Sequence, residues 1–328
     1  MDITIAAKQE QELCKLEKAY SVGALLYTPA VYENMAEKIA THDFKSIAFC
    51  LEDSIADDAL AEAEASLKKT LKEIKSKALA KLPMIFVRVR SPKHLKYIHS
   101  MLTDEIEIIT GYILPKFDST NAEAYKTLFL EINAGREKPL YFMPILESRL
   151  IIDKRTRDKE LYTIKSILDS IAQYILNVRV GGNDFCNIFG VRRNERQTIY
   201  DVGVVCDILI DILNVFSCDY VVSGPVWEYF GKDRNGAWAQ GLKRELELDR
   251  LNGFIGKTSI HPEQLPLIHE SLMVDKNDYQ DALHILNWDS MKLGVGASAN
   301  QSRMNEVKCH LKWARKIYLL GKIYGVKE

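Results

Sequence analysis

The chain has 328 residues, 47% of them hydrophobic, and a formal net charge of −1. This near-neutral charge argues against a general electrostatic attraction to nucleic acid or to an anionic membrane surface. No run of about 18 apolar residues predicts a transmembrane helix, and the charged N-terminal segment MDITIAAKQEQELCKLEKAY lacks the apolar centre of a secretory signal.

Eight short apolar runs recur along the chain, each rich in β-branched or aromatic residues and each ending in polar residues. In chain order they are 24–30, 46–54, 83–90, 111–117, 140–148, 177–185, 219–227 and 253–262. Helix-like stretches separate them, and the clearest are 59–82, 159–176 and 199–216. Continuous apolar runs, rather than alternating ones, indicate parallel strands that are buried on both faces.

The alternation of strands and helices predicts a (β/α)8 TIM barrel over residues 1–270, with an extra N-terminal segment before the first strand. The alternative is an open doubly wound sheet, but no GxGxxG motif follows the first strand. Residues 271–328 are predicted to form a C-terminal helical extension with a helix at 306–325. This extension either packs on the barrel or contacts a neighbouring subunit.

The six cysteines, at 14, 50, 186, 206, 218 and 309, form no CxxC pair, and most lie in apolar runs. This pattern favours buried free thiols in a reducing cytoplasm over disulfides or a zinc site.

Polar residues follow the predicted strands repeatedly, at the end of the barrel where active sites of this fold lie. They are Thr28, Glu52, Asp53, Arg88, Arg90, Lys116, Glu147, Asp184, Ser223, Ser259 and His261. Charged groups after five consecutive strands are costly to bury unless they pair or bind something. A ring of salt bridges that closes the barrel mouth is the structural alternative, and it is compatible with a working site.

Glu147 and Asp184 follow the fifth and sixth strands, which are neighbours in a barrel. Two carboxylates with room for waters suit Mg²⁺, with Mn²⁺ as the alternative ion, because Mg²⁺ prefers one or two protein carboxylates together with water and substrate oxygens. Such a metal acts as a Lewis acid on a carbonyl and stabilises the enolate that forms.

Eight motifs at the strand ends resemble, in the same order, those of the citrate lyase beta subunit family. That family belongs to a larger group with malyl-CoA lyases and 2-keto-3-deoxy acid aldolases. The matching segments run from about Ala24 to Gln264: LLYTP, LEDSIADD, VRVR, ILPK, ILES, GGNDF, SGP and GKTSIHPEQ. The resemblance implies a TIM-barrel carbon–carbon lyase, and homo-oligomers, often trimers or hexamers.

The resemblance also implies roles for single residues. Glu147 and Asp184 become the Mg²⁺ ligands, and Arg88 the cation that faces the substrate carbonyl or carboxylate. Glu52 and Asp53 would hold metal waters or Arg88, and Lys116 would support the site electrostatically. The residues also allow plainer roles: Asp53 as a helix cap, Lys116 as an ion-pair partner of Glu52 or Glu147.

The chain departs from the family pattern at several positions. Gly23 and Ala24 stand where the family has Arg-Ser, which removes a cation near the acyl or phosphate part of the ligand. Phe185 follows Asp184 where the family prefers a small residue, and is expected to narrow the pocket. The tail segment Met304-Asn305-Glu306 is the nearest match to a Met-x-Asp segment that enters a neighbouring subunit's site in acyl-CoA members. These departures put a CoA ester in doubt as the ligand.

A basic cluster of Arg192, Arg193 and Arg196 follows Asp184. It either binds a phosphate or a CoA tail as a cofactor site, or is a solvated loop paired with nearby acids. Trp227, Tyr229 and Phe230 either line a pocket or pack in the core.

The hypothesis is therefore a Mg²⁺-dependent lyase or aldolase acting on a 2-oxo acid or related carboxylate through a metal-stabilised enolate, with no nucleic-acid or membrane partner. The general base is open between a metal-bound water, His261 and Glu306. A thioesterase or other hydrolase on the same scaffold and a non-catalytic subunit of a larger complex are the alternatives. The substrate and the direction of reaction do not follow from the sequence.

Overall fold

All eight expected strands are present in the computed structural model, which describes residues 3–288 and 293–327. Each pairs in parallel with its neighbours, in the order β7-β6-β5-β4-β3-β2-β1-β8. The strands are β1 (Ala24–Pro29), β2 (Ser46–Cys50), β3 (Met84–Arg88), β4 (Gly111–Leu114), β5 (Tyr141–Leu146), β6 (Val178–Val180), β7 (Val222–Ser223) and β8 (Lys257–Ser259). A bridge between Gly224 and Lys257 joins β7 to β8, so the predicted barrel is confirmed.

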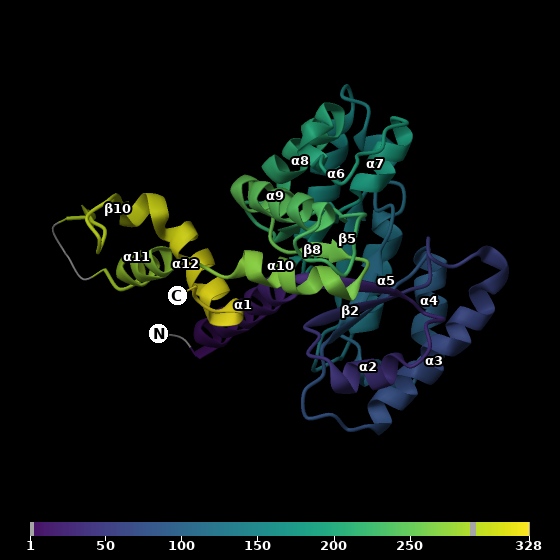
Figure 1. Cartoon of the computed structure of the whole chain (residues 1–328). Helices are drawn as coiled ribbons and strands as arrows, with labels where there is room; N and C mark the ends of the chain where they lie inside the picture. The colour runs from purple at the N-terminus through teal and green to yellow at the C-terminus, as the bar shows by residue number, and fades with distance from the viewer. Residues whose placement is uncertain (1–2, 289–292, 328) are drawn as a thin grey trace. The chain divides into compact units, whose positions relative to one another are not determined.

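Helices connect the strands and surround them in the first of two units, Met1–Leu267 (Figure 1). They are α1 (Ile3–Ser21), α2 (Met35–Thr41), α3 (Leu60–Ser76), α4 (Pro92–Met101), α5 (Ala122–Asn133), α6 (Arg157–Asp169), α7 (Gly182–Ile188), α8 (Gly203–Phe216), α9 (Ala237–Asn252) and the start of α10 (Leu265–Leu272). Short 3₁₀ helices lie at η1 (Asp57–Ala59), η2 (Asp104–Ile108), η3 (Arg149–Ile151), η4 (Ala172–Tyr174), η5 (Ile199–Asp201) and η6 (Pro262–Gln264). Helix α3 ends earlier than expected, because Ala78 adopts a left-handed φ of 44°.

Alternate residues of each strand face the helices and the barrel interior. In β3, Ile85 and Val87 belong to the apolar cluster that joins the strands to the helices, whereas Phe86 and Arg88 alternate with them and lie on the other face. Burial of a side chain such as Ile85 stabilises the fold by about 1.5–3 kcal/mol. The same alternation brings Arg88 into the barrel mouth.

The second unit, Ile268–Glu328, contains the end of α10, a helical pair and a small hairpin. Its elements are α11 (Lys276–Leu286), β9 (Val295–Ala297), β10 (Met304–Glu306) and α12 (Val307–Tyr324). Arg303 pairs with Asp278 at 2.7 Å and with Asp281 at 2.6 Å, which attaches the hairpin to α11.

Two expectations about composition can be checked against the fold. No helix within residues 3–288 or 293–327 is both long and apolar enough to cross a membrane. All six cysteines are free, as expected. Cys50 and Cys186 are buried, but Cys14, Cys218 and Cys309 are exposed, so the expected burial does not extend to all of the thiols.

A buried ion cluster fixes the last barrel strand to α9. Lys257 is 0% exposed, and its Nζ lies 2.9 Å from Glu245 Oε1 and 2.6 Å from Asp249 Oδ2. The Tyr200 hydroxyl donates to the other Asp249 oxygen at 2.8 Å. Since water does not reach these charges, each one depends on its partners.

Replacing Lys257 with Met should lower the free energy of unfolding by about 3–5 kcal/mol, because Asp249 would stay buried without its cation and Glu245 would depend on Arg193, 3.6 Å away. Urea denaturation of the purified variant measures this loss. Lys154→Met is the control: Lys154 is exposed and pairs with Asp207 at 3.2 Å, so its loss should cost less than about 1 kcal/mol. Equal losses in both variants would contradict the role given to the cluster.

Candidate active site

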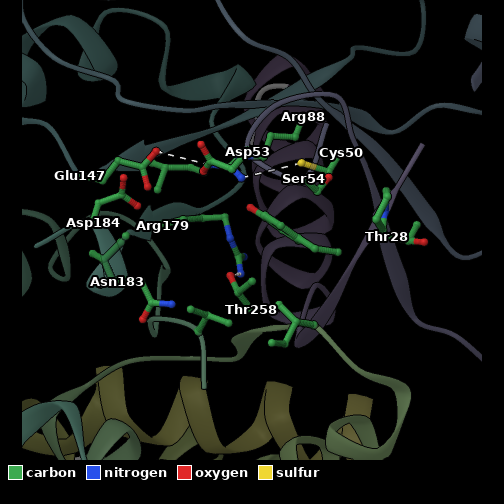
Figure 2. Close-up of a pocket in the computed structure, with 17 residues that line it drawn as sticks. Thr28, Cys50, Asp53, Ser54, Arg88, Glu147, Arg179, Asn183, Asp184 and Thr258 are labelled. Atoms are coloured by element: carbon green, nitrogen blue, oxygen red, sulfur yellow. Dashed lines mark hydrogen bonds and ion pairs between the residues drawn. The ribbon is translucent and has the colours of Figure 1, made fainter. Parts of the chain in front are cut away.

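A cavity of about 420 Å³ opens among the residues that follow the strands (Figure 2). Four charged residues expected from the sequence line it: Asp53, Arg88, Glu147 and Asp184. They come from segments after β2, β5 and β6 and from the end of β3. The barrel therefore brings together residues that lie far apart in the sequence.

Glu147 directly follows β5 and is only 4% exposed. Its Oε1 accepts a hydrogen bond from the backbone N–H of Lys116 at 2.9 Å and lies 3.6 Å from Arg88 Nη2. Burial raises the pKa of Glu147 to about 8, although the Arg88 charge opposes that rise. An ionised carboxylate at this position thus lacks sufficient positive charge from the protein.

Asp184 lies in the first turn of α7, four residues after β6 ends at Val180. Its carboxylate and that of Glu147 face the same space in Figure 2. The Asp184 charge is close enough to help raise the pKa of Glu147. Within the described residues, no Lys, Arg or His lies within 4.0 Å of the Asp184 carboxylate.

Two carboxylates that repel each other across a cavity fit a hard divalent cation. Within the described residues, no group of three His, Cys, Asp or Glu residues gathers to hold a metal alone. Mg²⁺ does not need three such ligands, because it keeps several waters and takes oxygens from its substrate. Glu147 and Asp184 therefore fit Mg²⁺, and zinc is disfavoured because its sites use three or four protein ligands.

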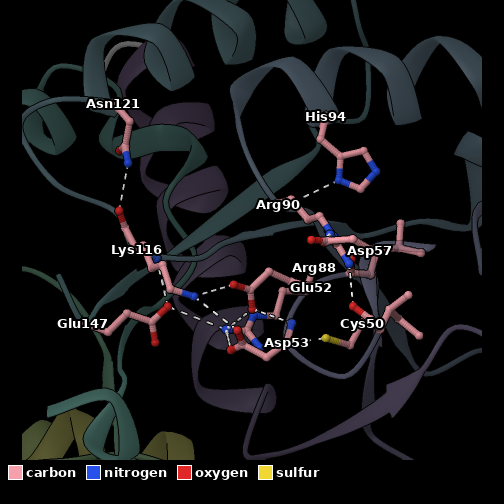
Figure 3. A network of polar contacts seen from close by, with 12 residues as sticks. Cys50, Glu52, Asp53, Asp57, Arg88, Arg90, His94, Lys116, Asn121 and Glu147 are labelled. Carbon is pink, nitrogen blue, oxygen red and sulfur yellow. Dashed lines mark hydrogen bonds and ion pairs between the residues drawn. The ribbon is translucent and has the colours of Figure 1, made fainter. Parts of the chain in front are cut away.

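Arg88 is held in place by two carboxylates from the loop after β2 (Figure 3). Its Nη2 lies 2.8 Å from Glu52 Oε2 and 2.9 Å from Asp53 Oδ2. Burial raises the pKa of Glu52. Burial also acts to raise the pKa of Asp53, but the hydrogen bond with Glu52 and the charges of Arg88 and Lys116 lower it to about 2. The guanidinium is therefore fixed in direction before any ligand arrives.

Lys116 contacts both the acidic pair after β2, Glu52 and Asp53, and the buried Glu147. Its Nζ lies 2.5 Å from Glu52 Oε1 and 3.2 Å from Asp53 Oδ1, while its backbone N–H donates to Glu147. Its backbone has a φ of 48°, a left-handed conformation that costs a residue with a side chain about 1 kcal/mol or more. This conformation directs both the N–H and the side chain of Lys116 toward the site.

Arg90 supports the loop after β2 from behind. Its Nε donates to the Leu51 carbonyl at 2.7 Å, its Nη2 donates to the Ile55 carbonyl at 2.5 Å, and it pairs with Asp57. Arg90 thus holds the loop that carries Glu52 and Asp53 and does not line the cavity.

Gly181 leaves the space that the Glu147 carboxylate occupies. A Cβ at this position would lie 2.1 Å from Glu147 Oε2, which is a steric overlap. Gly181→Ala should therefore displace Glu147 and weaken Mg²⁺ binding by roughly 10- to 100-fold, the range seen when a metal ligand loses its orientation. Isothermal titration calorimetry with Mg²⁺ measures the change.

Gly203→Ala is the matched control, because a Cβ at Gly203 meets nothing within 4 Å. It should leave Mg²⁺ affinity unchanged. Parent-like affinity in the Gly181→Ala protein would mean that Glu147 does not bind the metal through the position seen here.

The two arginines predicted to bind a cofactor lie outside this cavity. Arg193 is buried, stacks on Trp227 at 5.1 Å, and its Nη2 lies 3.6 Å from Glu245 Oε1. Arg192 is exposed, pairs with Glu228 at 3.2 Å, and lines a separate hollow of about 310 Å³. The hollow adjoins the cavity, because Asn183 lines both. Of the two arginines, Arg192 is therefore the one that a ligand extending from the cavity into the hollow would meet.

Other aromatic and polar residues have packing roles. Phe185 does not narrow the cavity: it is fully buried in the apolar cluster beneath it. Trp227 is fully buried, and the Tyr229 hydroxyl donates to the Arg193 carbonyl. His261 accepts a hydrogen bond from the Glu263 backbone and stacks on Phe230 with ring centroids 4.2 Å apart, so its ring is occupied outside the cavity.

Among the cavity residues that were not singled out as site residues from the sequence are Tyr27, Arg179 and Thr258. The signal for Arg179 was present, because a charged residue stands in the middle of the apolar run NVRV. Tyr27 and Thr258 carried no signal, since both residue types are common in ordinary strands.

The comparisons with known proteins give a family and a fold. A family model described as C–C bond lyase of the TIM-barrel fold matches residues 16–326. No curated protein matches the chain. The predicted carbon–carbon lyase class and the barrel fold are confirmed by this family model.

Solved structures similar to this chain share the fold at low identity. A citrate lyase from Burkholderia xenovorans LB400 is 14% identical, with 93% of each chain covered and a TM-score of 0.63. The CitE protein from Mycobacterium tuberculosis, in complex with magnesium, acetoacetate and coenzyme A, is 17% identical over 92% of this chain and 98% of its own, with a TM-score of 0.59. RipC from Yersinia pestis is 15% identical over 77% of this chain and 95% of its own, with a TM-score of 0.53.

Proposed function

The chain belongs to the C–C bond lyase family of the TIM-barrel fold and is a carbon–carbon lyase, and from this premise we propose that it acts on a small carboxylate substrate with Mg²⁺ held by Glu147 and Asp184. The observation that carries this proposal is the pair of carboxylates facing one cavity, in which the arginine that lies 3.6 Å from Glu147 is already bound to Glu52 and Asp53. The similar structure with magnesium and acetoacetate supports the choice of ion and of substrate class.

In this proposal the chain's own residues bind and orient the substrate. When bound, Mg²⁺ would supply Lewis-acid stabilisation of the negative charge that develops on a substrate carbonyl oxygen. Arg88 would direct a fixed positive charge at the same oxygen, and Glu52 and Asp53 would keep its guanidinium from turning away. Such preorganised charge lowers the barrier because no reorganisation is needed as the carbon–carbon bond breaks.

Lys116 would adjust the charge of the site without touching the substrate. Its side chain offsets the two carboxylates that hold Arg88, and its N–H stabilises the ionised form of Glu147. The general base is left open. His261 is occupied by Glu263 and Phe230, so it is a weaker candidate than a solvent molecule in the cavity.

The test is a product analysis with two classes of compound. The purified protein is incubated with 2-oxo and 3-hydroxy acids, and separately with their CoA thioesters, with Mg²⁺ or with a chelator, and products are followed by mass spectrometry. The proposal expects the substrate to be cleaved into two smaller products in the samples that contain Mg²⁺ and not in those with chelator. In the reverse direction it expects two compounds to be joined into one product.

The alternatives predict other products. Free CoA and an intact acid would identify a thioesterase. Full inertness of the isolated protein, together with its recovery in a stable heterocomplex, would favour a non-catalytic subunit. The CoA esters remain in the assay because Arg192 lines a hollow next to the cavity, where it could meet a phosphate of the CoA tail.

A further inference from the structure

Arg179 places a positive charge inside the barrel, where other proteins of this fold pack branched apolar side chains. It lies in β6, opposite Ile145 of β5 and Ser223 of β7. Its Nη2 donates to Thr258 Oγ1 in β8 at 2.7 Å, so the side chain spans the interior. The residue is only 1% exposed.

The partners of the Arg179 guanidinium are neutral. Besides Thr258, it donates from Nη1 to Asn177 Oδ1 at 3.2 Å. Its Nε has no hydrogen-bond partner in the described part of the chain. A buried guanidinium without a carboxylate partner costs several kcal/mol, so the fold carries this charge at the expense of stability.

The other buried arginines are paired with carboxylates. Arg88 lies 2.8 Å from Glu52, Arg157 lies 2.5 Å from Asp211, and Arg193 lies 3.6 Å from Glu245. Within residues 3–288 and 293–327, no carboxylate lies within 4.0 Å of the Arg179 guanidinium. The missing anion is therefore a property of this one position.

The charges around the cavity balance without Arg179. Arg88 and Lys116 offset Glu52 and Asp53, to which they are directly bound. A divalent cation would offset Glu147 and Asp184. One positive charge then remains, and it belongs to Arg179.

The cavity gives a ligand access to this charge. Arg179, Thr258 and Tyr27 line the same space as Glu147 and Asp184. In Figure 2 the Arg179 side chain lies between the two carboxylates and Thr258, deep in the barrel. A substrate that meets the metal at one end would meet Arg179 at the other.

We propose that Arg179, together with Thr258 and Tyr27, binds a second anionic group of the substrate, a carboxylate or a phosphate separate from the oxygens that face the metal. This inference rests on the proposed function and narrows its substrate class: the substrate is an acid with two anionic groups. The second anionic group would pair with the Arg179 guanidinium, which has no carboxylate partner in the described part of the chain. Its binding would hold the bond that breaks in a fixed position relative to the metal.

Binding of matched compounds in the presence of Mg²⁺ tests the inference. The probes are 2-oxo dicarboxylates with one to three methylene groups, each compared with a 2-oxo monocarboxylate of the same length that ends in methyl. Phosphonopyruvate represents the phosphate class. The parent should bind the best doubly charged compound roughly 10- to 100-fold more tightly than its neutral-ended match, since a charge-assisted bidentate contact contributes this much.

Arg179→Leu should remove this preference and leave binding of the monocarboxylates within about threefold of the parent. Thr258→Val, which removes the hydroxyl that orients Arg179, should reduce the preference several-fold. Arg157→Leu is the control: Arg157 is equally buried but does not line the cavity, and the preference should persist in that variant.

Two results would overturn the inference. One is a parent that shows no preference for any doubly charged compound, a result that does not depend on any variant folding. The other is a preference that survives in Arg179→Leu. Failure of the parent to bind any of the acids in a Mg²⁺-dependent way would instead contradict the proposed function, so the two failures are distinguishable.

Discussion

Replacing Glu147 with Gln should weaken Mg²⁺ binding by about 100-fold or more and reduce lyase activity by roughly 1,000-fold. The first figure follows because removing a residue that only orients a ligand already costs 10- to 100-fold in metal affinity. The second corresponds to about 4 kcal/mol of lost charge stabilisation. Asp184→Asn should produce losses of similar size, since the two carboxylates line the same space. Calorimetry and product analysis measure the two effects.

Thermal unfolding separates a lost metal from a damaged fold. The parent should gain thermal stability when Mg²⁺ is added, because the ion binds the folded state. The metal-free Glu147→Gln protein should be at least as stable as the metal-free parent at neutral pH. Burial raises the pKa of Glu147 to about 8, above that of an unfolded glutamate, so the folded protein favours the neutral form and Gln supplies it permanently.

Glu105→Gln serves as the control, because Glu105 is also buried but accepts its hydrogen bonds from Thr103, away from the cavity. It should retain the response to Mg²⁺. If Glu147→Gln and Asp184→Asn both bind Mg²⁺ like the parent, the metal assignment is wrong.

Replacing Arg88 with Met should reduce activity by about 100- to 1,000-fold and lower the free energy of unfolding by about 3–5 kcal/mol. The catalytic loss arises because a fixed charge next to the reacting oxygen disappears. The loss of stability arises because Glu52 remains buried with one cation fewer. Steady-state kinetics and urea denaturation give the two quantities separately.

Arg88→Lys separates charge from geometry. An ammonium keeps the charge but lacks the planar fork that reaches Glu52 and Asp53 together. We expect Arg88→Lys to have most of the stability that Arg88→Met loses. Its kcat should still be at least tenfold lower than that of the parent. Arg157→Met, which breaks pairs with Asp207 and Asp211, should lose stability without losing kcat. An equal loss of kcat there would assign the Arg88 effect to general unfolding.

The barrel fold could be predicted from the sequence, and so could the grouping of the site residues at one end of it. Both depend only on the order of the strands. A residue just after a parallel strand lies at the carboxyl edge of the barrel whatever its detailed conformation. For this reason Glu147, Arg88 and the acids after β2 come together as the motif order implies. No knowledge of helix packing is needed for that step.

Side-chain direction within each segment does not follow so simply. Successive residues of a helix point about 100° apart, so Asp184 at the start of α7 faces the cavity while Phe185 faces the core. Arg192 and Arg193, in the loop after α7, also differ, one exposed and one buried. Arg179 required the register of β6 before its inward direction was evident.

The left-handed backbone of Lys116 restricts how this site can change during evolution or engineering. Glycine or asparagine would accept the conformation but would lose the ammonium group, and most other residues would be strained in it. Arginine would keep a charge at the same conformational cost but would need more room beside Glu52 and Asp53. A saturation library at this codon should therefore yield few active clones, and substrate range is better broadened at Ile260 or Val226, which line the cavity without taking part in its charge network.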